Sequence, residues 1–337
     1  MNIGNHNLET NGTYIIAEIG SNHNQSKQLA YETIDAAIEC GANAVKFQSL
    51  NINKLYFNPS QDIINLHKKI DLEESWHYDL KYYCDKKGIT FFSAPTYLSS
   101  IDILEELNVE LYKLASAQIG TFPQLVEKVI SLGKPVIFST GLATTYHIGK
   151  VMELFHKHNN PNHIILHCNS IYPTPYEKVN LGLINRYKGI FNTTVGFSDH
   201  SDGIATAIAA VSLGAQVIEK HFAMDRKLPV PDAPFSLEPK DFKAMVDGVR
   251  IAEKVRGSKV RNEIEPEEQE FKTAITTRLV LTKKVSKGDL VKEEDFTYLR
   301  SPKGISCTKL YEILECGARY TKDIQEIREL HETDITS

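Results

Sequence analysis

The chain has 337 residues, of which 42% are hydrophobic and 24% are charged, and its formal net charge is -5. The length suits one large and one small domain, the composition is typical of a folded globular protein, and the weak net charge implies no nucleic-acid partner. The five cysteines are an odd number and form no CxxC pair, which favours a reducing compartment. With no signal-peptide pattern and no bilayer-length apolar run, the sequence predicts a cytoplasmic protein without a membrane partner.

The pattern along most of the chain is an alternation of short apolar runs and amphipathic stretches. The polar, asparagine-rich residues 1–12 come first, and we expect them to be disordered. Between residues 13 and 256 lie eight apolar runs, at 14–19, 44–48, 89–94, 111–116, 136–140, 164–168, 194–197 and 217–220. Eight strands alternating with helices predict a closed (β/α)8 TIM barrel. An open doubly wound sheet is the alternative, but no GxGxxG follows the first run.

The residue pattern changes after the segment that is expected to form the barrel. Residues 257–271 are highly charged, and we expect a linker there. Residues 272–337 follow as a small, mostly β module, with strands expected at 278–282 and 296–300. A module of this size is marginally stable alone, so it is expected to pack against its own barrel or a partner's.

Polar residues recur where each apolar run stops, and in a barrel these strand ends face the active site. They are Glu18, Lys46, Gln48, Ser93, Lys113, Ser116, Ser139, Asn169, Ser198, His200, Lys220 and His221. Strands commonly end in polar residues, but three lysines, one glutamate and two histidines at eight ends are more than that tendency explains. We therefore interpret this rim as a candidate site.

The residue types at this rim indicate a particular chemistry. His200 and His221 close neighbouring strands, and two neutral imidazoles side by side can hold a divalent metal ion; His23, in a nearby loop, is a weaker third candidate. Lys46 and Lys113 lie in apolar surroundings, so each needs an anion, either a neighbouring carboxylate or a bound phosphate or carboxylate ligand. Glu18 is either a salt-bridge partner or an acid–base group.

Several motifs, in order along the chain, resemble the sialic acid synthase family. They are the segments AEIGSNHN at 17–24, KFQ at 46–48, LHCNSIYPTP at 166–175, GFSDHS at 196–201, EKHF at 219–222 and PDAPFSLEP at 231–239. The C-terminal module resembles that family's antifreeze-like (SAF) domain, with Arg300 ahead of Pro302 and Gly304. The resemblance extends from about residue 13 to 300.

The resemblance implies an enzyme that condenses phosphoenolpyruvate with the aldehyde of an N-acetylated amino sugar, giving a nine-carbon 2-keto acid and phosphate. It implies Mn²⁺, or Mg²⁺ or Co²⁺, on His200 and His221, which act in catalysis with Glu18. Phosphoenolpyruvate ligands are implied at Lys46, Lys113, Ser116, Ser139, Ser198 and Lys220. Acceptor-sugar ligands are implied at Gln48, Asn169, Tyr172, Asp232 and Arg300. Because the SAF-domain arginine serves the partner subunit's site in that family, a domain-swapped homodimer is implied as well.

The chain departs from the family pattern at a few positions. Gln118 stands where many members carry an acidic residue, Ala94 stands where a threonine is common, and Val230 replaces a glycine. We interpret these as a changed acceptor, such as a 2,4-diacetamido-trideoxyhexose leading to legionaminic or pseudaminic acid. The alternatives are another phosphoenolpyruvate-dependent aldol-type synthase and a catalytically weakened sugar- or phosphate-binding homologue.

Overall fold

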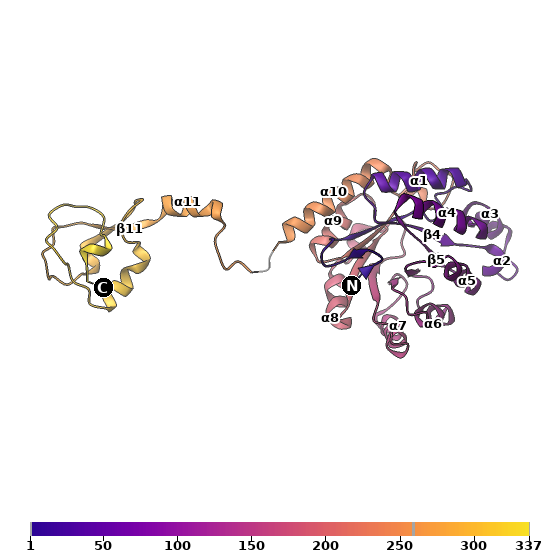
Figure 1. The fold of residues 1–337 in the computed structure, drawn as a ribbon, viewed down its shortest axis with the longest axis horizontal. Coiled ribbons are helices and arrows are strands. Elements are labelled where there is room, and N and C mark those ends of the chain that lie inside the picture. The colour runs from indigo at the N-terminus through magenta and orange to yellow at the C-terminus, as the bar shows by residue number, and fades with distance from the viewer. Residues whose placement is uncertain (1, 258–259, 337) are drawn as a thin grey trace. The chain divides into compact units, whose positions relative to one another are not determined.

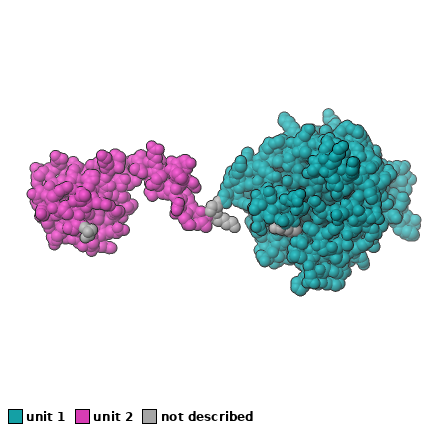
Figure 2. Space-filling model, viewed as in Figure 1, with its two compact units in different colours: residues 1–257 teal, residues 258–337 magenta. Residues whose placement is uncertain are grey.

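The computed structural model describes residues 2–257 and 260–336, and the chain divides into two compact units, residues 1–257 and 258–337 (Figure 2). No helix within the described residues is long and apolar enough to cross a membrane.

The first unit is built on eight parallel strands, which confirm the eight runs predicted from the sequence. They are β3 (Tyr14–Glu18), β4 (Ala44–Ser49), β5 (Thr90–Pro95), β6 (Tyr112–Leu114), β7 (Val136–Ser139), β8 (His163–Cys168), β9 (Thr194–Asp199) and β10 (Val217–His221). Neighbours pair in the order β5-β4-β3-β10-β9-β8-β7-β6, and β5 and β6, at the two ends of this order, lie against each other. The sheet is therefore a barrel and not an open doubly wound sheet.

Helices surround this barrel (Figure 1). They are α1 (Lys27–Glu39), α2 (Ile52–Leu55), α3 (Gln61–Ile70), α4 (Glu74–Lys87), α5 (Leu98–Glu106), α6 (Pro123–Ser131), α7 (Thr145–Lys157), α8 (Gly182–Phe191), α9 (Ala205–Ser212) and α10 (Pro239–Arg256). Local signals set their starts: the Ser26 side chain accepts from the Leu29 N–H, and prolines occupy the first turns of α6 and α10.

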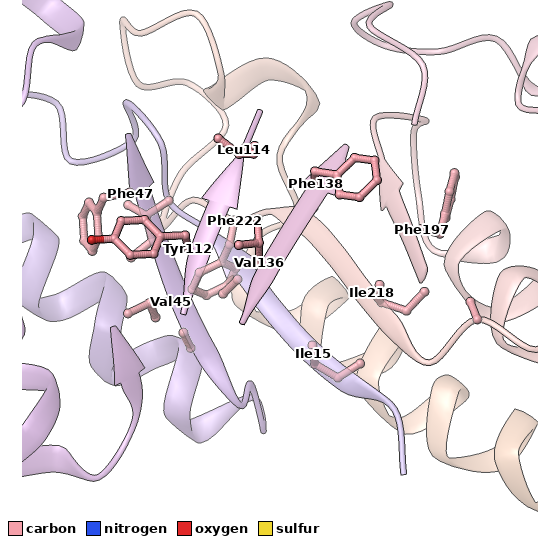
Figure 3. Packing of buried hydrophobic residues seen from close by; sticks show 14 of the residues in the cluster. Ile15, Val45, Phe47, Tyr112, Leu114, Val136, Phe138, Phe197, Ile218 and Phe222 are labelled. Atoms are coloured by element: carbon pink, nitrogen blue, oxygen red, sulfur yellow. The ribbon is translucent and has the colours of Figure 1, made fainter. Parts of the chain in front are cut away.

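The strands bury both of their faces, and alternate residues face opposite ways. One set, including Ile15, Phe138, Phe197 and Ile218, packs against the helices (Figure 3). The other set forms a smaller apolar cluster inside the barrel near the strand starts, with Tyr14, Ile16, Ile137, Ile164 and Val217. Charged and polar side chains occupy the inward positions further along the strands, which places them at the carboxyl end of the barrel.

The N-terminal segment is ordered, which corrects the expectation of disorder for residues 1–12 as far as the described residues 2–12 are concerned. β1 (Asn2–Ile3) and β2 (His6–Asn7) form a small antiparallel pair. Ile3 and Leu8 are buried in the inner apolar cluster beside Tyr14. Two apolar side chains in a polar segment thus anchor it to the amino end of the barrel, and composition alone does not reveal this.

The second unit has its own small core. α11 (Pro266–Ile275) is followed by β11 (Thr277–Leu281), which pairs antiparallel with β12 (Phe296–Arg300), and α12 (Leu310–Glu315) follows. Both predicted strands are present, and their apolar residues pack with Val291, Tyr320 and Leu330. The predicted linker 257–271 contains the first turns of α11, while its residues 258–259 lie outside the described residues.

Candidate active site

Four charged side chains meet inside the carboxyl end of the barrel, each at most 6% exposed. Lys46 Nζ lies 2.7 Å from Glu18 Oε2 and 3.6 Å from Glu219 Oε1, and Lys113 Nζ lies 3.5 Å from the same Glu219 oxygen. Ser198 Oγ donates to Glu219 Oε1 at 3.1 Å. Both lysines thus have carboxylate partners, and the cluster is balanced in charge when all four groups are ionised.

The two carboxyl groups of this cluster differ in their proton affinity. Burial raises the pKa of Glu18, even though Lys46 and Gln48 oppose the shift. Burial acts in the same direction on Glu219, but Lys113 and Lys46 outweigh it and hold the pKa of Glu219 at about 2. Glu219 therefore stays ionised as the fixed counter-charge of the lysines, and Glu18 is the carboxyl group suited to moving a proton.

Strand alternation explains one residue that the sequence prediction missed and one that it misplaced. Glu219 lies two residues before His221 on β10, so the two share the barrel-facing side. Lys220, between them, faces the opposite side, where its Nζ lies 2.9 Å from Asp199 Oδ2 and donates to the Ser201 carbonyl at 2.5 Å. The prediction that Lys220 binds phosphoenolpyruvate is contradicted by this placement. The period of two along β10 would have identified both residues.

The predicted serines differ in their contacts. Ser198 bonds Glu219, as described above, whereas Ser139 ends β7 with an Oγ that has no hydrogen-bond partner among the described residues. Ser116 lies just beyond β6 and its Oγ contacts Cys168 Sγ at 3.6 Å. All three are buried. Ser116 thus lies just beyond β6, the strand of Lys113, and Ser139 is the last residue of the neighbouring strand β7.

The two histidines lie side by side at the same end of the barrel. The rings of His200 and His221 have centroids 5.4 Å apart and planes at 55°. His200 Nδ1 lies 2.7 Å from the Asn169 carbonyl oxygen, so a proton on Nδ1 donates to that carbonyl and Nε2 remains as the ligating nitrogen. Burial lowers the pKa of His221 to about 3, so this imidazole is neutral, and its Nδ1 has no hydrogen-bond partner within the described residues.

Burial opposes the charged form of His200, but Cys168 outweighs it and raises the pKa of this histidine. In their neutral forms the two imidazoles fit a divalent metal ion of the Mn²⁺ type. The fit is limited to two protein ligands, because no group of three His, Cys, Asp or Glu residues placed to hold a metal occurs in the described part of the chain. His23, the weaker third candidate, is buried with its ring edge-on to Trp76.

A pocket of about 500 Å³ opens beside His221 and contains most of the predicted acceptor ligands. It is lined by Gln48, Tyr172, Pro173, His221, Pro231, Asp232, Pro234 and Phe235. Gln48 Nε2 donates to Glu18 Oε1 at 2.7 Å, and the Tyr172 ring lies 4.3 Å from that of His200. Phe235, which the sequence prediction omits, packs against both Tyr172 and His221. The residues that line the pocket therefore contact both histidines, and Gln48 connects the pocket to Glu18.

The remaining predicted residues lie outside this pocket lining. The Asn169 amide donates to the carbonyls of Lys178 and Val179, so its side chain holds a neighbouring loop and its backbone holds His200. Arg300 is the exposed last residue of β12 in the second unit. Gln118 is buried, and its Oε1 has no partner among the described residues.

Gly20→Ala should cost about 100-fold in activity, because a displacement of the site groups around Gly20 by about 1 Å has an effect of that size. Gly20 has φ +50°, and an added Cβ would lie 2.6 Å from Asp232 Oδ2 and 3.1 Å from Glu18 Oε1. Asp232 Oδ2 also accepts from the Ser21 N–H and hydroxyl, so it has little freedom to move. Steady-state kinetics with the acceptor varied would measure the effect.

The matched control for that substitution is Gly88→Ala. Gly88 also has a positive φ, of +76°, but its added Cβ would meet nothing within 4 Å. It should therefore show the backbone strain, of about 1 kcal/mol, without the loss of activity. Equal activity losses in the two variants would contradict the close-approach explanation.

Enzymes with an eight-stranded α/β barrel carry their active sites at the carboxyl end of the strands, and the charged and polar groups at that end place this chain in the class of barrel enzymes. Residues 33–261 match the model of the NeuB family. The chain is 35% identical to a pseudaminic acid synthase of Campylobacter jejuni, over 99% of this chain and all of the relative, and 33% identical to an N,N'-diacetyllegionaminic acid synthase of the same species, over 93% and 97%. A solved N-acetylneuraminic acid synthetase from Leptospira borgpetersenii superposes with a TM-score of 0.74 at 35% identity, covering 80% of this chain and 94% of that one. The chain belongs to the NeuB family, the sialic acid synthase family that its motifs resemble.

Proposed function

We propose that this protein joins phosphoenolpyruvate to the open-chain aldehyde of an N-acetylated amino sugar, which gives a nine-carbon 2-keto sugar acid and releases phosphate. The observation that carries the proposal is the position of His221. It follows Glu219 of the lysine cluster on β10, and it lines the pocket that contains Gln48 and Asp232. An anion on the lysines and an aldehyde in the pocket would therefore meet beside the histidine pair.

Lys46 and Lys113 hold the phosphate and carboxylate groups of phosphoenolpyruvate, with Ser116, Ser139 and Ser198 as neutral donors. The contacts of both lysines with Glu219 support this role, because they fix the ammonium groups before the substrate binds. Donors that are preorganised in a buried site need no further reorganisation during the reaction. The lysines thereby keep carbon 3 of phosphoenolpyruvate directed at the aldehyde carbon.

The bond changes then follow from the substrates. Carbon 3 bonds to the aldehyde carbon, whose oxygen takes a proton and becomes a hydroxyl, and carbon 2 gains cationic character. Water adds at carbon 2, and the resulting tetrahedral intermediate expels phosphate. We assign proton transfer from this water to Glu18, because burial raises its pKa and it contacts both Lys46 and Gln48.

His200 and His221 would hold a divalent metal ion, Mn²⁺ in the first place, with Mg²⁺ or Co²⁺ as alternatives. When bound there, such an ion supplies Lewis-acid polarisation of the aldehyde oxygen. The protein's own contribution is to keep the His221 imidazole neutral and to fix His200 through the Asn169 carbonyl.

For the acceptor we propose a 2,4-diacetamido-trideoxyhexose, and hence a product of the legionaminic or pseudaminic acid type. The relatives named pseudaminic and N,N'-diacetyllegionaminic acid synthases support this choice. The departures from the family pattern support it as well, since Ala94 lies opposite Gln48 in the strand register and Val230 precedes Pro231 of the pocket.

The test is phosphate release from phosphoenolpyruvate with Mn²⁺, measured with a 2,4-diacetamido-2,4,6-trideoxyhexose and with N-acetylmannosamine, each with and without a chelator. We expect chelator-sensitive release with the diacetamido sugar. Release with N-acetylmannosamine alone would correct the acceptor, and release only with a shorter phosphorylated aldose would favour another aldol-type synthase. No release with any aldehyde would overturn the proposal in favour of a sugar- or phosphate-binding homologue.

We place this reaction in the cytoplasm. All five cysteines are free thiols, and three of them, Cys40, Cys84 and Cys168, are buried. Such cysteine use is usual in a reducing compartment and unusual in a secreted protein of this size.

We further propose that the second unit is the SAF domain that its motif resembles, and that Arg300 serves the acceptor pocket of a partner subunit in a domain-swapped homodimer. β12 ends in exposed residues, with Tyr298 44% and Leu299 54% exposed beside Arg300. Large apolar side chains next to an arginine are the kind of surface that a protein–protein contact covers, which supports the proposal.

Mixing two inactive variants tests that dimer. Arg300→Ala and His221→Ala should each be nearly inactive alone, but a dissociated and reassociated mixture should recover about a quarter of the wild-type activity, because half of the dimers would be mixed and each would have one complete site. Size-exclusion chromatography gives the oligomeric state in parallel. A mixture as inactive as its components would contradict the exchange of Arg300 between subunits.

A further inference from the structure

Asp199 and Lys220 form a buried ion pair on the outer face of the barrel sheet, directly behind the two histidines. Lys220 Nζ lies 2.9 Å from Asp199 Oδ2, and both side chains are at most 1% exposed. The register of β9 and β10 places Lys220 opposite Asp199. Each residue is followed in the chain by a histidine, Asp199 by His200 and Lys220 by His221. The pair therefore links the two strand ends that carry the imidazoles.

The pair also fixes the backbone on both sides of His200. Asp199 Oδ1 accepts from the Ser201 N–H at 2.9 Å and from the Ser201 hydroxyl at 2.7 Å, while Lys220 Nζ donates to the Ser201 carbonyl at 2.5 Å. Thr206, at the start of α9, donates its hydroxyl to Asp199 Oδ2 at 2.7 Å. His200 lies between two residues that this network holds, so its backbone has little freedom to shift relative to β10.

Neither catalysis nor simple stabilisation accounts for this network. The pair faces the helix layer and is separated by the sheet from Lys46, Lys113 and Glu219, so it does not contact the reacting groups. A buried ion pair is also a poor stabiliser, because apolar side chains of similar volume in its place are often neutral or stabilising. What it supplies is geometry: metal ligands must be held within about 0.5 Å and 10–20° of the productive arrangement.

We propose that Asp199 and Lys220 are positioning residues, which set the distance and angle between His200 and His221 and thereby the affinity and coordination geometry of the site for a divalent metal ion. The inference rests on the proposed metal-dependent function. It adds two residues that touch neither the metal ion nor the substrates.

The experiment compares the wild-type protein with the double variant Asp199→Asn/Lys220→Met, because removal of one partner alone would leave a buried charge unpaired. Mn²⁺ alone is titrated in the absence of substrates and followed by electron paramagnetic resonance, and Co²⁺ is followed by its visible absorption. We expect the Mn²⁺ dissociation constant of the double variant to rise by about 10–100-fold and its Co²⁺ spectrum to change. Thermal unfolding followed by circular dichroism shows whether the variant is folded. Should the double variant not fold, Thr206→Val removes one bond to Asp199 without changing charge, and it should weaken Mn²⁺ binding by a few-fold.

The matched control is Ser49→Ala, which disrupts another buried polar network on the outer face of the barrel. Ser49 ends β4 and its Oγ contacts His77 Nε2 and Ser93 Oγ, both at 2.8 Å. Mn²⁺ affinity should not change in this variant. The inference would be overturned, with the metal site left standing, if the double variant kept the Mn²⁺ affinity and Co²⁺ spectrum of the wild-type protein. The same conclusion would follow if Ser49→Ala lost as much Mn²⁺ affinity as the double variant. A wild-type protein that binds no Mn²⁺ would overturn the metal site and the inference together.

Discussion

His221→Ala should abolish Mn²⁺ binding and reduce phosphate release by about 10³-fold or more, since several kcal/mol of transition-state stabilisation come from the polarised aldehyde oxygen. His221 closes β10 between the lysine cluster and the acceptor pocket. Burial lowers its pKa to about 3, so the substitution removes a neutral group and leaves the charge balance of the buried lysines and carboxylates unchanged. Phosphate release and Mn²⁺ titration are the measurements, with circular dichroism to show that the barrel is folded.

His163→Ala is the control for that experiment. His163 begins β8 at the opposite end of the barrel, where its ring packs against Phe155 at 4.7 Å. The His163→Ala substitution also removes a partly buried histidine whose pKa is lowered by burial, but it should leave Mn²⁺ binding unchanged. Metal-dependent turnover that persists in His221→Ala would show that the metal site has been assigned to the wrong residues.

Glu219→Gln should lower the free energy of unfolding by about 3–5 kcal/mol, because it leaves buried lysines without one of their two carboxylates. Glu219 is the shared partner of Lys46 and Lys113. Inorganic phosphate or phosphoenolpyruvate should restore part of the lost stability, since an anion on the lysines replaces the missing charge. Urea unfolding with and without each anion measures both effects, and phosphate release should fall by about 100-fold as the ammonium groups lose their fixed positions.

An exposed carboxylate provides the comparison for Glu219. Glu127 pairs with Lys157 and His158 at the surface, where its side chain is 40% exposed. Glu127→Gln should change the free energy of unfolding by no more than about 1 kcal/mol, and phosphate should have no differential effect. If Glu219→Gln unfolded at the wild-type urea concentration, the lysines would not depend on this carboxylate, and the charge-balanced cluster would be the wrong description of the site.

The barrel could be predicted from the sequence because its signals are local and repeated. Each strand is a short apolar run followed by a helical stretch, and the polar residues that end these runs share one rim in any parallel barrel. Glu18, Lys46, Lys113, His200 and His221 could therefore be named without a structure, and the structure brings all five to the carboxyl end of the barrel. The family motifs name Gln48, Tyr172 and Asp232, which the structure brings together in one pocket lining.

The order of the N-terminal segment and the direction of Lys220 are where sequence reasoning failed. For residues 2–12, the composition is polar on average and indicates disorder. The segment is nevertheless ordered, because Ile3 and Leu8 pack into the apolar cluster at the amino end of the barrel. For Lys220, position at a strand end alone suggests a place in the site, whereas the alternation of faces along β10 sends this side chain to the side opposite Glu219 and His221.

The sequence by itself determined the barrel, the rim on which the site lies and the residue types there, because hydrophobic periodicity specifies strands, helices and faces. Only the tertiary structure decided that Glu219 is shared by Lys46 and Lys113, and that Asp199 and Lys220 pair behind the histidines. The physical reason is that these contacts join residues far apart in the chain, through the stagger of neighbouring strands and the closure of the sheet. The period of one strand carries no information about the partner that another strand presents to it.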